Sequence, residues 1–159
     1  MDNEIQKMIS ALSYTPDILK DLIKDIPEPE RKKRSRPGKW SIHENACHLA
    51  QAEKMINQRF VIFTEEEQPK FDPYLPGDTV NDNGLIDLDL EKEMSSFREL
   101  RKYTVAMLRF FSPEDWEKEA SHPEYYRYNP KILLRHTLMH DHFHMYRIEE
   151  LWLTKPEFL

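Results

Sequence analysis

Histidines are concentrated at one place in this sequence: of seven in total, four lie within the nine residues from 136 to 144. Two of these, His140 and His144, are four residues apart, so in a helix their imidazoles lie on one face, a turn apart. A neutral imidazole nitrogen is a good ligand for a divalent ion, at about 2.0–2.1 Å for zinc. Two ligands alone bind weakly, so the pair predicts a metal site only if a third comes from elsewhere.

His48 is the best candidate for the third ligand. It flanks an apolar stripe in a predicted helix over residues 41–64 and can lean into the same interior as His140 and His144, which fall on the apolar stripe of their own helix. Three histidines would leave coordination positions open for water or substrate. The alternative is that these are core histidines whose ring nitrogens are satisfied by hydrogen bonds, which for an adjacent pair requires four partners.

The remaining histidines are assigned other roles. His136, one turn before His140, is a possible fourth ligand or a support for the site, but its place at the edge of the stripe favours a structural role. We expect His43 in an exposed first helical turn, His122 in a loop, and His142 about 160° from the face of the pair.

Other catalytic motifs match the sequence less well than a three-histidine metal site does. A zinc-protease H-E-x-x-H motif would need glutamate at Asp141, and the sequence has no P-loop, no G-x-G-x-x-G and no G-x-S-x-G. Neighbours on a helix diverge by about 100°, so Cys47 and His48 do not form a nucleophile pair. Cys47 is predicted to be a small buried thiol.

The elements that must position these histidines are long stretches without glycine or proline. Ser41 and Glu44 form a capping box that predicts a helix start, and Asn129-Pro130 predicts another. No clear strand pattern is present. The predicted fold is an all-α, antiparallel four-helix bundle with a long connection, residues 65–86, between helices 2 and 3. The four helices are expected at about residues 3–26, 41–64, 87–111 and 130–153. The first of them either begins near residue 3 and bends at Pro16 or begins at the Thr15-Pro16 cap.

Composition narrows the class of protein. The length of 159 residues predicts one domain over 1–159, and a net charge of −6 argues against nucleic-acid binding. The basic run Arg31–Arg36 is interpreted as a solvated loop. One cysteine, the lack of a signal peptide and the lack of a long apolar run predict a cytoplasmic protein without a disulfide or a membrane partner.

Several of these residues together resemble a known family, the DinB-like (DNA-damage-inducible) superfamily of metal-binding four-helix bundles. The resemblance covers about residues 15–151 and joins a W-S-x-x-E-x-x-x-H motif to a distant H-x-x-x-H. The matching positions are Lys39-Trp40-Ser41-Ile42, Glu44, His48-Leu49-Ala50, Glu53, Arg59, His140, His144 and Ile148. In many relatives an acidic residue stands where this chain has Gln51, so Glu53 or Asp141 would have to support the ligands if a carboxylate does so.

The resemblance implies a divalent ion held by residues that map onto His48, His140 and His144, with zinc or nickel ahead of iron or manganese. It also implies bacillithiol S-transferase-like chemistry, in which a low-molecular-weight thiol attacks a small electrophile in detoxification or stress response. Tyr74 and Arg59 are candidate substrate contacts. The alternatives are a metal- or ligand-binding bundle without turnover and a structural bundle that forms a homodimer.

Overall fold

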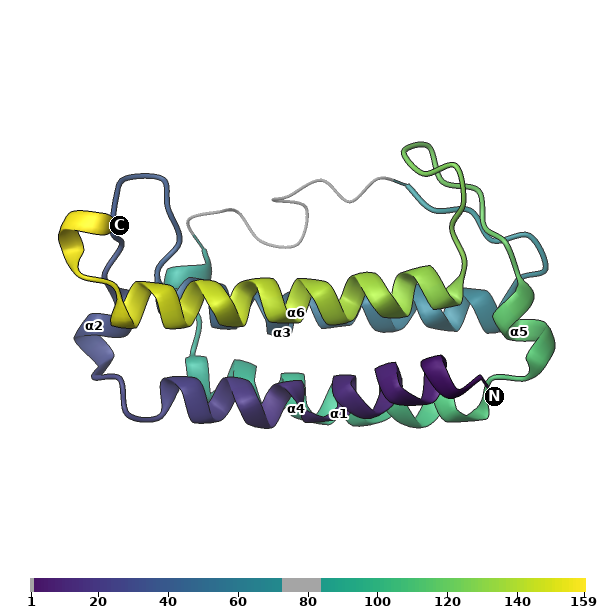
Figure 1. Cartoon of the computed structure of the whole chain (residues 1–159), viewed down its shortest axis with the longest axis horizontal. Coiled ribbons are helices and arrows are strands. Elements are labelled where there is room, and N and C mark those ends of the chain that lie inside the picture. Colours follow the sequence, from purple (N-terminus) through teal and green to yellow (C-terminus); the bar gives the residue numbers. More distant parts are fainter. Residues whose placement is uncertain (1, 73–83) are drawn as a thin grey trace.

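The computed structural model describes residues 2–72 and 84–159, and its main elements are four long helices (Figure 1). These are α1 (Asn3–Ile23), α3 (Ile42–Glu65), α4 (Leu90–Phe110) and α6 (Pro130–Leu153). Shorter helices lie between them and at the C-terminal end: α2 (Glu28–Lys32), η1 (Leu85–Asp87), α5 (Pro113–Glu117) and η2 (Pro156–Phe158). Within the described residues no strand forms, and an isolated bridge joins Lys70 to Ser121.

Each long helix begins where a side chain caps its exposed backbone N–H groups. Ser41 accepts a hydrogen bond from the backbone of Glu44, whose carboxylate accepts one from the backbone of Ser41, as the capping box predicts. Asp2, Asp89 and Asn129 cap the other three helices in the same way with one side-chain acceptor each. The predicted starts of α3 and α6 are therefore confirmed to within a residue.

The long helices pack in a ring of two layers, with α6 beside α3 and α1 beside α4 (Figure 1). The predicted all-α four-helix bundle with a long connection is confirmed. Because the connection from α3 returns the chain to the end where α3 began, α3 and α4 run parallel. The antiparallel neighbours are α1 with α4 and α3 with α6.

The basic run differs from the expected solvated loop. Arg31 and Lys32 belong to α2, and Arg34 binds the carboxylate of Glu44, which is fully buried, through two guanidinium nitrogens. A bidentate pair of this kind is strong and directional. It fastens the segment before α3 to the start of that helix, so the run has a structural role at Arg34.

The interior has two apolar clusters with a polar layer between them. One cluster joins the first half of α1 to the second halves of α3 and α4 and the start of α6, and the other joins the opposite halves. Polar side chains between the clusters are buried, among them Thr15, Glu53, Arg101 and Asp141. No helix in the described part of the chain is both long and apolar enough to cross a membrane.

Candidate metal centre

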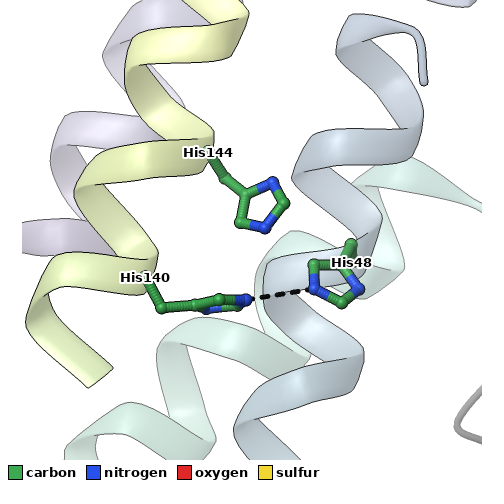
Figure 2. Close-up of side chains that lie close together, drawn as sticks. All are labelled: His48, His140 and His144. Atoms are coloured by element: carbon green, nitrogen blue, oxygen red, sulfur yellow. Dashed lines mark hydrogen bonds between the residues drawn. The ribbon is translucent and has the colours of Figure 1, made fainter. Parts of the chain in front are cut away.

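The middle of the bundle brings together the three histidines that the sequence predicts as ligands. His48 projects from α3, and His140 and His144 project from consecutive turns of the neighbouring α6 (Figure 2). One ring nitrogen from each residue lies within 4.8 Å of those of the other two. That these nitrogens bind a metal stays a prediction, but their convergence at one interior point is now a structural fact.

The spacing of the nitrogens suits a shared ion. The Nε2 atoms of His48 and His140 are 3.1 Å apart. Two nitrogens bound to one ion at about 2.0–2.1 Å lie about 2.9 Å apart at octahedral angles and about 3.3 Å apart at tetrahedral angles. Three imidazoles are also a donor set that zinc, nickel and iron accept. The three residues therefore have the donor atoms, and His48 and His140 the spacing, that a divalent ion requires.

Asn45 determines which nitrogen of His144 faces the cluster. The Asn45 amide donates from Nδ2 to the carbonyl of Ser41, which leaves Oδ1 directed at Nδ1 of His144, at 2.8 Å. Since a carbonyl oxygen only accepts, Nδ1 must carry the proton. The lone pair of His144 then lies on Nε2, on the side of the other two rings, as a metal ligand requires.

Burial keeps the three rings uncharged. Desolvation, followed by the neighbouring His140, lowers the pKa of His48 to about 4. Desolvation and both neighbouring histidines lower the pKa of His144 to about 2. Desolvation also lowers the pKa of His140, against an opposing effect of Asp141. At neutral pH all three imidazoles are neutral, the form that binds metals.

Trp40 lies against the histidine cluster on the segment before α3. Its ring centroid is 4.6 Å from that of His48 and 5.9 Å from that of His144, in a stacked arrangement with the latter. An indole in this position shields the rings from water and limits their rotation.

The two carboxylates proposed as supports for the ligands have a different partner. Arg101, which is buried, donates to Glu53 Oε2 at 2.6 Å and to Asp141 Oδ2 at 2.5 Å. Thr104 donates to the second oxygen of Glu53, and Thr15 donates to Asp141. Neither carboxylate has a hydrogen bond to a histidine of the cluster in the described structure, so Asn45 fills the supporting role that the sequence interpretation assigned to Glu53 or Asp141.

The other histidines lie outside the ligand group. The ring of His136 lies tilted against that of Tyr125 and does not join the three converging nitrogens. His142 is exposed, as predicted. The prediction for His43 is wrong: it is 3% exposed, and η1 of the long connection packs against its helix. His122 does lie in a loop but is buried against Tyr128.

Two further residues bear on the site predictions. Cys47 is buried, and desolvation raises the pKa of its thiol to about 12, so it is an unreactive core residue as expected. Gln51 donates to Glu93, 2.6 Å away, and so takes no part in the cluster.

The two candidate substrate contacts and Asn45 can be compared with the sequence analysis. Arg59 lines a hollow that also includes His140, whereas Tyr74 lies outside the described residues. The sequence analysis assigned no role to Asn45. The signal that could have identified it is its place three residues before His48, on the same helical face.

The fold and site agree with a comparison against protein families. Residues 11–148 match the model of the DinB superfamily, so this chain belongs to that family. The predicted family is thereby confirmed.

Individual relatives carry names that refer to a metal. A "Putative metal-dependent hydrolase" of Oceanobacillus iheyensis is 29% identical over 122 residues, which cover 76% of this chain and 69% of the relative. One of the same name from Bacillus mycoides is 27% identical, with the same coverage. Among solved structures, YfiT from Bacillus subtilis, described as "a probable metal-dependent hydrolase with an unusual four-helix bundle topology", is similar to this chain. The two share 22% identity with a TM-score of 0.83, over 95% of this chain and 87% of YfiT, which shows a shared fold.

Proposed function

We propose that this protein is a metal-dependent enzyme that transfers a low-molecular-weight thiol to a small electrophile. The observation that carries the proposal is the convergence of three neutral imidazoles from His48, His140 and His144 beside hollows that reach the surface. A divalent ion bound there, zinc or nickel before iron or manganese, would supply positive charge that favours a thiolate over a thiol. The cytoplasm, where small thiols stay reduced, is the proposed location.

The chain's own residues have separate tasks in this proposal. Asn45 holds His144 in the tautomer that presents Nε2, and Trp40 limits access of water to the rings. In the described part of the chain, no fourth histidine, cysteine or carboxylate joins the group, so the ligand set has room for a substrate sulfur. Arg101 already occupies Glu53 and Asp141, which favours a nucleophile that needs no carboxylate as general base.

The test is conjugation by protein loaded with zinc or nickel. Cysteine, glutathione or bacillithiol is mixed with iodoacetamide, and the thioether product is followed by mass spectrometry. We expect a rate well above that of His144→Ala at the same protein concentration. Equal rates for the wild type and His144→Ala with every thiol would overturn the proposal.

A second candidate is hydrolysis, favoured by the names of the curated relatives. In that reaction water takes the place of the thiol as nucleophile. Release of p-nitrophenol from p-nitrophenyl acetate without any thiol present, lost in His144→Ala, would favour the hydrolase. Dependence of the reaction on an added thiol would favour the transferase.

A further inference from the structure

Two hollows approach the histidine cluster from opposite ends of its helix pair. The first, of about 250 Å³, is lined by His140 and by residues on its N-terminal side of α6 and beyond His48 on α3. The second, of about 670 Å³, is lined by His144 and by later residues of α6, with Asn45 from α3. Because each hollow includes one member of the cluster, a ligand in either one can reach the same interior point.

The hollow beside His140 combines aromatic and apolar side chains with polar ones. Tyr125 stacks on Tyr128 at 5.6 Å between ring centroids and lies 5.4 Å from the ring of His136. Apolar side chains from α3 and α6 form part of its walls: Ala52, Met55, Ile56 and Leu133. Glu124 and Thr137 also line it. Arg59 is at the rim and donates to the Tyr128 hydroxyl at 3.2 Å. We call this the aromatic hollow, and its walls suit a flat, apolar group.

The hollow beside His144 also has aromatic side chains, Trp40, Phe143 and Phe158, and differs from the first in its charge. Its side chains carry three positive charges, on Arg36, Lys39 and Arg147, and one negative charge, on Glu150, in a chain whose net charge is −6. Arg36 already donates to a backbone oxygen of Leu159, which also lines the hollow. Arg147 binds Glu150, and among the described residues no carboxylate lies within ion-pair distance of Lys39. We call this the basic hollow. An excess of positive charge beside a nucleophile site selects an anionic ligand.

We propose that the basic hollow binds the carboxylates of the thiol substrate, with Lys39 and Arg147 as specificity-determining residues, while the aromatic hollow holds the electrophile. This inference rests on the proposed transferase function and assigns each substrate to one side of the cluster. The thiol sulfur would form a bond to the electrophilic carbon while that carbon's bond to its leaving group breaks. The leaving group departs as an anion with the electron pair, and the thiol proton passes to solvent.

The basic hollow can be tested with two thiols that differ in charge. Mercaptosuccinate carries two carboxylates and 2-mercaptoethanol carries none, and iodoacetamide serves as the common electrophile, releasing iodide. In the double variant Lys39→Met, Arg147→Gln we expect KM for mercaptosuccinate to rise about tenfold, as for loss of charge-assisted hydrogen bonds. KM for 2-mercaptoethanol should stay within about twofold.

The matched control is Lys102→Met, Arg109→Met, which removes the same charge from exposed residues of α4, in the other layer of the bundle. It should leave both KM values unchanged. An equal change for the two thiols, or an equal change in the control, would overturn the assignment of the basic hollow.

Binding without turnover separates this inference from the proposed function. Mercaptosuccinate is titrated calorimetrically into the zinc-loaded protein with no electrophile present. Weaker binding in the Lys39→Met, Arg147→Gln variant, with no conjugation by the wild type, would retain the anion subsite and contradict the transferase. Conjugation by the wild type, together with unchanged mercaptosuccinate binding in the variant, would support the transferase and contradict the anion subsite.

The aromatic hollow can be tested with two electrophiles, one aromatic and one not. Conjugation of 1-chloro-2,4-dinitrobenzene, which releases chloride, is compared with that of iodoacetamide in Tyr125→Ala. We expect KM for the aromatic electrophile to rise about three- to tenfold and KM for iodoacetamide to stay the same, since only the flat ring can stack. A parallel change for both electrophiles would contradict the assignment.

Discussion

Two buried polar clusters share the middle layer of this bundle, and they differ in how well the protein satisfies them. Around Arg101, hydrogen-bond donors are paired with acceptors. The two Nη atoms of Arg101 donate to Glu53 and Asp141. The hydroxyls of Thr104 and Thr15 donate to the same two carboxylates. In the histidine cluster, ring nitrogens face each other, and one can donate to the other only if it carries its ring's proton. His48 and His140 point Nε2 atoms at each other across 3.1 Å, and Nδ1 of His140 is buried without a partner among the described residues.

The difference separates a structural role from a binding role. The Arg101 network draws residues from all four long helices, so it fixes their relative positions, with only Nε of Arg101 lacking a described partner. The histidine cluster joins only α3 and α6, and in the proposed metal site a cation at the point that its nitrogens share would accept their lone pairs. Buried polar groups can therefore be assigned a structural or a binding role by asking whether the protein itself supplies their hydrogen-bond partners.

The largest expected effect concerns the arginine network. Arg101→Met removes the cation and leaves two buried carboxylates without compensation. We expect the free energy of unfolding to fall by about 3–5 kcal/mol. Urea denaturation followed by circular dichroism measures it. A loss below about 1 kcal/mol would show that this network does not hold the helices together.

A smaller loss of folding stability is expected when the pH of metal-free protein is lowered and protons bind the histidines of the cluster. The folded pKa of His48, about 4, lies below its unfolded value near 6.5, so between these values the unfolded chain binds more protons. Stability from this residue is present above about pH 6.5 and is lost as the pH falls towards 4.

For a group with these two pKa values the loss is about 2 kcal/mol at pH 5 relative to pH 7.5. The wild type should therefore lose about that much more stability than His48→Ala over this interval, in urea denaturation with a chelator present. Identical pH profiles for the two proteins would mean that the His48 ring is not buried in its neutral form.

A change in metal affinity is expected for the residue that orients a ring. Asn45→Ala removes the acceptor for Nδ1 of His144, so the ring can turn and adopt the other tautomer. We expect zinc affinity to fall about 10- to 100-fold, the usual effect of losing such a support. Competition with a chromophoric chelator measures it. Asn45→Asp, which keeps the acceptor, should retain most of the affinity, and equal losses in both variants would contradict the orienting role.

The sequence predicted the histidine cluster and the helices because both depend on local rules. The spacing of His140 and His144 follows from helical geometry, and the capping box at Ser41 defines where α3 begins. Given that start, His48 falls in the second turn of α3, facing α6.

The Arg101 network was missed for the opposite reason. Its partners Glu53 and Asp141 are 48 and 40 residues away, and a search for apolar stripes passes over a charged residue at a core position. His43 was misplaced because η1, at the end of the long connection, packs against its helix, and no local rule positions η1 there. Burial that depends on distant segments could not be predicted from the sequence alone.

The central claim is most directly tested by the metal content of four purified proteins, measured by inductively coupled plasma mass spectrometry after equilibration with zinc. They are the wild type, His48→Ala, His144→Ala and, as a control on the same helix, His142→Ala, which changes an exposed histidine. We predict about one ion per chain in the wild type and His142→Ala, and less than about a tenth of that in the other two. Equal metal content in all four proteins would contradict the account.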